Sequence, residues 1–92
     1  MQISIKKREK ISEQILAFLY SCSPKPCFTS EIAREIARDE EFVKKILIDL
    51  KGKRLVIEIR RNPQGKEYSR RQRWRISEIA FQAYKKLQDQ KN

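Results

Sequence analysis

The hydrophobic pattern of the chain changes its period near residue 54, and this change restricts the fold more than any other feature of the sequence. Before it, three segments place apolar residues three or four positions apart, as amphipathic helices do. After it, apolar and polar residues alternate over 55–60 and again around Trp74 and Ile76, as in strands with one buried face. The sequence therefore predicts an α+β fold in which three helices precede a two-stranded β-hairpin and a last helix follows it.

The three helices before the hairpin are expected within 6–22, 29–37 and 40–53. Two prolines end the first helix, and a short strand at 25–28 can follow it. Thr29 or Ser30 can cap the second helix and Asp39 the third, because their side-chain oxygens can accept hydrogen bonds from the free amides of a first turn. The positions expected to be buried are Ile11, Ile15, Phe18 and Leu19, then Ile32, Ala33 and Ile36, then Phe42, Val43, Ile46, Leu47 and Leu50.

The hairpin and the last helix follow from the same kind of pattern. "NPQG" at 62–65 is typical of a turn, since Pro63 presets its second backbone angle and Gly65 suits its end. Ser77 can cap a final helix over 77–89. The inward positions of the strands are expected to be Leu55, Ile57 and Ile59 on the first and Tyr68, Trp74 and Ile76 on the second. On the last helix, the residues expected to face the core or a partner are Ile79, Ala80, Ala83, Tyr84 and Leu87.

Positive charge is concentrated in the hairpin. The net charge of the chain is +10, and residues 53–76 hold nine Lys or Arg against two acids. A basic segment of this kind indicates a polyanionic partner, with nucleic acid as the first candidate. The alternative is the densely charged surface of a thermophile-like protein, but that alternative predicts acids and bases in balance.

Enzymatic classes find little support in the sequence. Histidine is absent, which removes the commonest general base and zinc ligand. No glycine-rich phosphate loop or nucleophile motif occurs, and no apolar run reaches the length of a membrane span or a signal-peptide core. We therefore expect a cytoplasmic protein that is not an enzyme, with no cofactor, no metal, no membrane contact and no evident small-molecule ligand.

The two cysteines, Cys22 and Cys27, flank "SPKP". Two thiols without histidine cannot complete a tetrahedral zinc site. The spacing leaves two interpretations open, a disulfide or two small buried side chains. Intracellular disulfides are ordinary mainly in hyperthermophiles, and the high Lys, Arg, Glu and Ile content would suit such a source.

One long stretch, "TSEIAREIARDEEFVKKILIDLKGKRLV", resembles the helix-turn-helix of multiple-antibiotic-resistance-type and related archaeal winged-helix regulators. "WRISEIAFQAYKKL" is similar to the last wing strand and C-terminal helix of the same family, so the resemblance covers about residues 11–87. It implies one winged helix-turn-helix domain over 1–92, with a recognition unit at about 29–53, a wing at about 54–76 and a C-terminal helix at about 77–89. The residues that carry the resemblance are Ile32, Ala33, Ile36, Val43, Ile46, Leu47, Leu50, Leu55 and Val56.

The chain departs from the family pattern at several positions. Ala37 stands in the turn where the family usually has glycine, and Arg38 follows where an apolar residue is common. Arg54 replaces the glycine that typically precedes the wing. The third helix begins with acids at 39–41, which phosphates would repel from a DNA groove, although acids also stabilise a helix N-terminus.

The resemblance implies a sequence-specific or semi-specific double-stranded DNA-binding protein, a small archaeal or viral transcriptional regulator or chromatin-associated protein. Its third helix would enter the major groove, and its wing arginines would enter the minor groove or hold flanking phosphates. A structural role is the alternative for each of these three regions: a solvated face for the third helix, a solvated loop for the wing, and a helix cap for the start of the second helix. The candidate DNA contacts are Lys44, Lys45, Ile48 and Lys51 on the third helix, Arg60, Arg61, Lys66, Arg70, Arg71 and Arg73 on the wing, and Thr29, Ser30 and Arg34 on the second helix.

The resemblance also implies a homodimer formed through the first and last helices. The segment "AFQAYKKLQ" supports this, because Phe81 adds to the apolar surface of the last helix. Two other functions remain open for a basic winged helix: binding structured or ribosomal RNA, and docking to a protein of the replication or transcription machinery. The acids at 39–41 favour the docking alternative.

Overall fold

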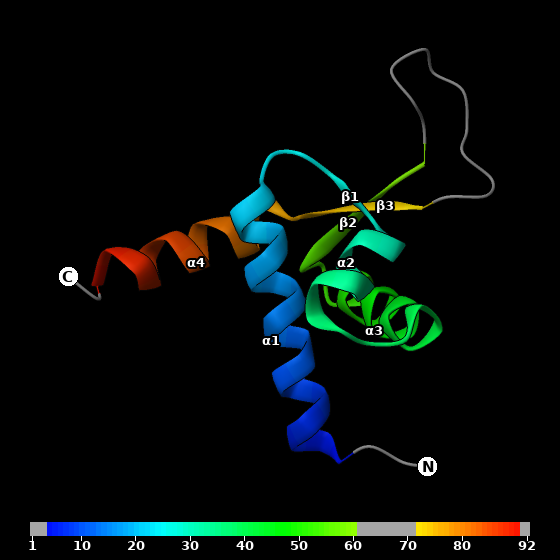
Figure 1. Cartoon of the computed structure of the whole chain (residues 1–92). Helices are drawn as coiled ribbons and strands as arrows, with labels where there is room; N and C mark the ends of the chain where they lie inside the picture. The colour runs from blue at the N-terminus through cyan, green and yellow to red at the C-terminus, as the bar shows by residue number, and fades with distance from the viewer. Residues whose placement is uncertain (1–3, 61–71, 91–92) are drawn as a thin grey trace.

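The computed structural model describes residues 4–60 and 72–90, and its element order is the predicted one (Figure 1). The predicted turn at 62–65 and Tyr68 lie outside the described residues. Within the described ranges, the short strand β1 joins the hairpin in an antiparallel sheet with strand order β1-β3-β2. The elements are α1 (Ile5–Cys22), β1 (Cys27–Phe28), α2 (Thr29–Ile36), α3 (Glu40–Gly52), β2 (Val56–Ile59), β3 (Arg73–Ile76) and α4 (Glu78–Gln90).

α1 packs against both β3 and α2. Ile11, Ile15 and Leu19 are buried as predicted, because residues four apart share one helix face. Phe18, expected in the same stripe, is only partly buried, whereas Leu16 is buried. The buried stripe of α1 is therefore wider than predicted and includes Leu16, and the helix contacts α3 and α4 as well as β3 and α2.

The turn between α2 and α3 uses a left-handed backbone. Ala37 has φ 56° and ψ 49°, the geometry for which the family usually has glycine, and Arg54 before the wing also has a positive φ of 64°. α3 then begins with the predicted cap, in which Asp39 Oδ2 accepts a hydrogen bond from Phe42 N–H at 3.1 Å. The chain therefore keeps the backbone path of a helix-turn-helix without the glycines.

The face of β2 that packs against the core is not the one that the sequence pattern predicted. Val56 is buried, whereas Ile57 is 36% exposed. Val56 pairs with Ile76 and Glu58 with Trp74. Paired residues of antiparallel strands share a face, so the burial of Trp74 and Ile76 brings Val56 and Glu58 inward. The prediction for Trp74 and Ile76 is confirmed, and the prediction that Leu55, Ile57 and Ile59 form the buried face was wrong.

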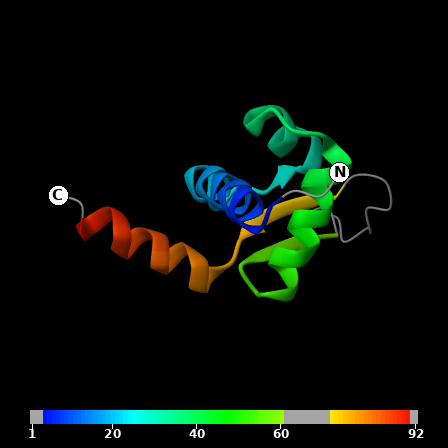
Figure 2. The same ribbon diagram turned by 90° about the horizontal axis from the view of Figure 1, so that it is seen from below.

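α4 extends away from the rest of the molecule (Figures 1 and 2). Its predicted cap is confirmed, since Ser77 Oγ accepts a hydrogen bond from Ala80 N–H at 3.2 Å. Of its apolar residues, only Ala80 is buried, while Ile79 and Leu87 are 73% and 56% exposed. The predicted inner face of this helix is therefore largely uncovered by its own chain. In the ranges that the structure describes, no helix combines the length and the apolar character that crossing a membrane requires.

Candidate nucleic-acid interface

The outer side of α3 carries the cations that the sequence analysis placed there. Val43, Ile46, Leu47 and Leu50 are buried against the core, so the remaining positions face outward. Lys45, Ile48 and Lys51 are exposed, and Lys44 is half-buried at the edge of the helix. The helix thus presents three lysines and one isoleucine that is 52% exposed. Lysine and isoleucine lack the planar paired polar groups of Arg, Asn and Gln that are best shaped for bidentate base contacts, so this face suits phosphate contact better than base recognition.

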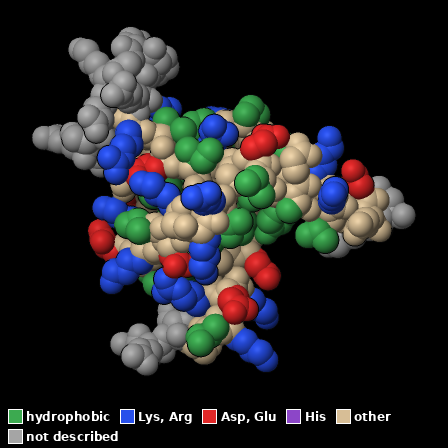
Figure 3. All heavy atoms as spheres, turned by 180° about the vertical axis from the view of Figure 1, so that it is seen from behind, with side chains coloured by type: hydrophobic (Ala, Val, Ile, Leu, Met, Phe, Trp, Pro, Cys, Tyr) green, Lys and Arg blue, Asp and Glu red, His purple; other side chains and the backbone are tan. Residues whose placement is uncertain are grey.

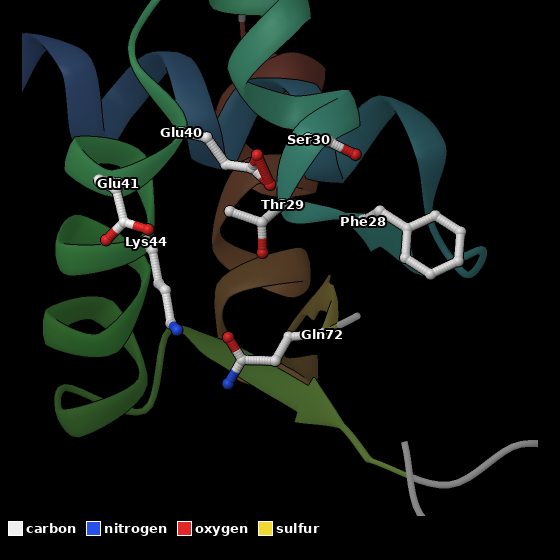
Figure 4. Close-up of a pocket in the computed structure, with 7 residues that line it drawn as sticks. All are labelled: Phe28, Thr29, Ser30, Glu40, Glu41, Lys44 and Gln72. Atoms are coloured by element: carbon white, nitrogen blue, oxygen red, sulfur yellow. The ribbon is translucent and has the colours of Figure 1, made fainter. Parts of the chain in front are cut away.

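A hollow of about 190 Å³ lies where the starts of α2 and α3 meet the residue before β3 (Figure 4). It brings together three predicted site residues, Thr29, Ser30 and Lys44. Glu40 and Glu41 line the same hollow. A phosphate placed here would meet carboxylates as well as an ammonium group, so the hollow as a whole is not a simple anion seat.

Thr29 has a structural role that the sequence analysis missed. The residue is 7% exposed, and its Oγ1 accepts a hydrogen bond from Trp74 Nε1–H at 2.8 Å. The prediction that Thr29 or Ser30 caps α2 was wrong, because Phe28 occupies the cap position and Glu31 Oε1 accepts a hydrogen bond from Phe28 N–H at 2.8 Å. Ser30 is half-buried, and Arg34 is exposed near the end of α2.

A cluster around Glu58 joins α3 to both strands of the hairpin. The side chain of Glu58 is 5% exposed. Its Oε1 lies 2.8 Å from Lys51 Nζ, and its Oε2 accepts a hydrogen bond from Gln72 Nε2 at 2.7 Å and lies 3.4 Å from Arg60 Nε. Two predicted DNA contacts, Lys51 and Arg60, are therefore ion-paired to one carboxylate. We call this group the Glu58 cluster: Lys51, Glu58, Arg60 and Gln72.

The Glu58 cluster favours the ionised carboxylate. Burial raises the pKa of Glu58, but the hydrogen bonds from Lys51 and Gln72 and the charges of Lys51 and Arg60 outweigh burial and hold this pKa below its usual range. The carboxylate is therefore charged at neutral pH and fixes the positions of the two cations. No local signal in the sequence points to Glu58, because its inward position follows from the pairing of β2 with β3, two segments far apart in the chain. An acid opposite a buried tryptophan then needs hydrogen-bonding partners.

The structure describes only part of the predicted wing site. Arg60 is exposed at the end of β2, and Arg73 is half-buried in β3. The remaining predicted wing contacts, Arg61, Lys66, Arg70 and Arg71, lie outside the described residues. Their roles therefore stay predictions.

The two cysteines lie side by side at the end of α1 and in β1. Both are free thiols in the structure, Cys22 half-buried and Cys27 buried. Burial, together with a hydrogen bond to Cys22, raises the pKa of the Cys27 thiol to about 12. Cys27 is therefore a neutral thiol at physiological pH, and the disulfide stays a prediction. Within the described ranges, no three potential metal ligands come together.

Comparison with known proteins identifies the fold. Neither a protein-family model nor a curated protein matches this sequence. A mutant of MepR from a multidrug-resistant S. aureus clinical isolate matches with 19% identity and a TM-score of 0.65, over 79% of this chain and 50% of that one. Another S. aureus MepR mutant, bound to an oligodeoxyribonucleotide, matches with 19% identity and a TM-score of 0.67, over 87% of this chain and 57% of that one.

A mutant of ZitR from Lactococcus lactis, in its apo form, gives a similar result. It matches with 20% identity and a TM-score of 0.64, over 94% of this chain and 62% of that one. This chain thus spans between half and about three-fifths of the length of these three proteins. The fold of the chain is the winged helix that the sequence resemblance implies.

Proposed function

We propose that this chain is a transcriptional regulator that binds double-stranded DNA through α3 and its arginine-rich wing. The Glu58 cluster carries this proposal, because it joins a lysine of the recognition helix to an arginine at the base of the wing. Cations from both elements are thereby held in fixed relative positions beside the most basic segment of the chain. A solved neighbour of the same fold, MepR, is bound to an oligodeoxyribonucleotide, which is consistent with this use of the fold.

The proposed mechanism is an equilibrium of binding, without chemical change of the DNA. Lys44, Lys45 and Ile48 approach the major groove, while the arginines of the wing reach an adjacent groove or its phosphates. The acids Glu40 and Glu41 at the start of α3 limit how deeply the helix can enter. Most of the affinity is therefore expected from phosphate contacts, and binding should fall steeply as salt rises.

The first prediction tests the wing by the salt dependence of DNA binding. If six basic groups contact phosphates, a plot of log K against log salt has a slope of about −5 for a labelled duplex in fluorescence anisotropy. Changing Arg61, Arg70 and Arg71 together to alanine should reduce the steepness by about two to three units. This set avoids Arg73, which is half-buried in β3.

In a charge-matched control variant, Lys25, Lys85 and Lys86 are changed to alanine. These lysines are exposed on the α1–β1 loop and on α4. It should keep the slope of the native chain, because its three lost charges lie away from α3 and the wing. An unchanged slope in the wing variant would contradict the assignment of DNA to the wing. Tighter binding of structured RNA than of duplex DNA at equal salt would contradict the choice of DNA.

We also propose that two copies associate through α1 and α4. Tyr20 of α1 lies 5.1 Å from Phe81 and 5.6 Å from Tyr84, measured between ring centroids. These rings join the exposed Ile79 and Leu87 in supplying apolar surface along a helix that extends from the domain. A second copy of this chain, with the same helix, offers a matching surface for a two-fold interface.

The second prediction concerns this association. Sedimentation equilibrium should give about twice the chain mass of 11.1 kDa. Changing Leu87 to glutamate should shift the mass toward the monomer, because the charge would be buried in the interface. Lys85→Glu changes an exposed position two residues before Leu87, on another side of the helix from Ile79 and Leu87, and serves as the control. A monomer mass for the native chain at every concentration would refute the dimer.

A further inference from the structure

The first turns of α1 carry a group of cations that helix stability does not explain. Lys6, Lys7, Arg8 and Lys10 occupy four of five consecutive positions, and the first turn has no acid. The dipole of a helix disfavours positive charge at its N-terminus, and like charges four positions apart, such as Lys6 and Lys10, repel each other. Positions that oppose local stability in this way are often retained for function.

A further cation approaches this group from another element. Arg38, in the turn between α2 and α3, lines the same open hollow as Lys7 and Lys10. The hollow measures about 500 Å³ and also contains Glu13 and Gln14. Arg38 is the residue that stands where an apolar side chain is common in the resembling family. We call Lys6, Lys7, Lys10 and Arg38 the α1 basic surface.

The charges of the α1 basic surface are free to meet an external partner. All four residues are exposed, and within the described ranges none of them takes part in an ion pair. Glu13 lies in the hollow but forms no ion pair with its neighbours among the described residues. Glu9 and Glu13 lie beside these cations and carry two negative charges against four positive ones, so the surface is net positive, which favours an anionic partner.

The position of this surface relates it to the proposed DNA contact. Arg38 immediately precedes Asp39, the cap of α3, so the surface begins where the recognition helix begins. Figure 3 shows Lys and Arg side chains spread along one side of the molecule, from the hairpin to the end where α1 starts. A duplex lying along α3 and the wing would therefore pass close to the α1 basic surface.

We propose that the α1 basic surface is an additional phosphate-binding site, which contacts the backbone of the same duplex beyond the segment bound by α3 and the wing. The inference rests on the proposed DNA-binding function. Exposed Lys and Arg side chains suit this role because they can follow phosphates without reading bases. The site thus lengthens the footprint and adds affinity that does not depend on sequence.

The third prediction tests this site with Lys7, Lys10 and Arg38 changed together to alanine. On a duplex of about two and a half helical turns, the slope of log K against log salt should become less steep by about two to three units. The affinity at low salt should fall about tenfold. On a duplex of about one turn, centred on the α3 contact, the variant and the native chain should differ much less. The order of preference among base sequences should stay the same, since phosphate contacts carry no sequence information.

The control is again the variant at Lys25, Lys85 and Lys86, which loses the same charge from other surfaces. If the native chain binds duplex DNA and the α1 variant keeps its slope on the long duplex, the additional site is refuted and the proposed function stands. An equal loss in the control variant would also refute it, since general charge would then explain the effect. If the native chain binds no duplex DNA, the proposed function fails and this inference fails with it.

Discussion

Replacing Trp74 with alanine is expected to lower the free energy of unfolding by about 4 kcal/mol, as the removal of a fully buried aromatic ring does. The side chain is 0% exposed and belongs to β3, the middle strand of the sheet. Its backbone pairs with Cys27 of β1 on one side and Glu58 of β2 on the other. α1 packs on the same strand, so the cavity left by the ring is enclosed by elements that cannot easily close it.

Part of this effect comes from a hydrogen bond rather than from packing. Trp74 Nε1–H donates to Thr29 Oγ1, and both groups are buried. Trp74→Phe keeps most of the ring but removes the donor, so a smaller loss of about 1 to 2 kcal/mol is expected. The matching change Thr29→Val removes the acceptor. The double variant should lose less unfolding free energy than the sum of the losses in the two single variants, because both changes remove the same hydrogen bond.

Far-UV circular dichroism with urea is the suitable measurement. Trp74 is the single tryptophan of the chain, so its variants lose the usual fluorescence signal. The change in unfolding free energy is compared at equal protein concentration, since the proposed association would make stability depend on concentration. A loss below about 1.5 kcal/mol for Trp74→Ala would show that β3 is not the centre of the core.

The helices could be predicted from the sequence because their patterns are local. Of the five residues of α3 expected inside, Val43, Ile46, Leu47 and Leu50 are buried and Phe42, in the first turn, is only partly buried. The period of one helix fixes the face of each of its residues. β2 was different, because both of its faces contain apolar residues. Its inward face depends on the register with β3, and that register is a contact between distant segments.

The candidate site could be predicted only in outline. The exposed lysines of α3 followed directly from its buried stripe. The ion pairs of Lys51 and Arg60 with Glu58 did not follow, because they depend on which way β2 faces. Thr29 shows the same limit: a hydroxyl at a helix start fits a cap pattern, but its actual partner is Trp74, 45 positions away. Local rules thus gave the elements, and long-range pairing decided how their side chains are used.

Changing Glu58 to glutamine is expected to lower the free energy of unfolding by about 2 kcal/mol at neutral pH. The carboxylate accepts hydrogen bonds from Lys51 and Gln72 and lies beside Arg60. A glutamine keeps the shape but loses the charge, and its amide group would bring a second donor toward Gln72. Hydrogen bonds to a charged group contribute more than neutral ones, which sets the size of the loss.

The stability lost in Glu58→Gln should become smaller as the pH falls. The pKa of Glu58 in the folded chain lies below its ordinary value of 4.5, so the unfolded chain takes up the proton first as the pH falls. The stability that the charged carboxylate supplies is fully present above pH 4.5 and is lost as the pH falls toward the lower folded pKa. The difference between the native chain and Glu58→Gln should therefore be constant near neutrality and shrink in acid.

Urea unfolding from pH 7 down to about pH 3, followed by circular dichroism, measures this difference. Glu35→Gln is the matched control, because Glu35 is exposed on α2 and the structure gives it no ion pair within the described ranges. It makes the same change of charge and should alter stability by less than about 0.5 kcal/mol. A Glu58→Gln difference that stays constant down to the lowest pH would show that shape, and not charge, holds α3 to the wing.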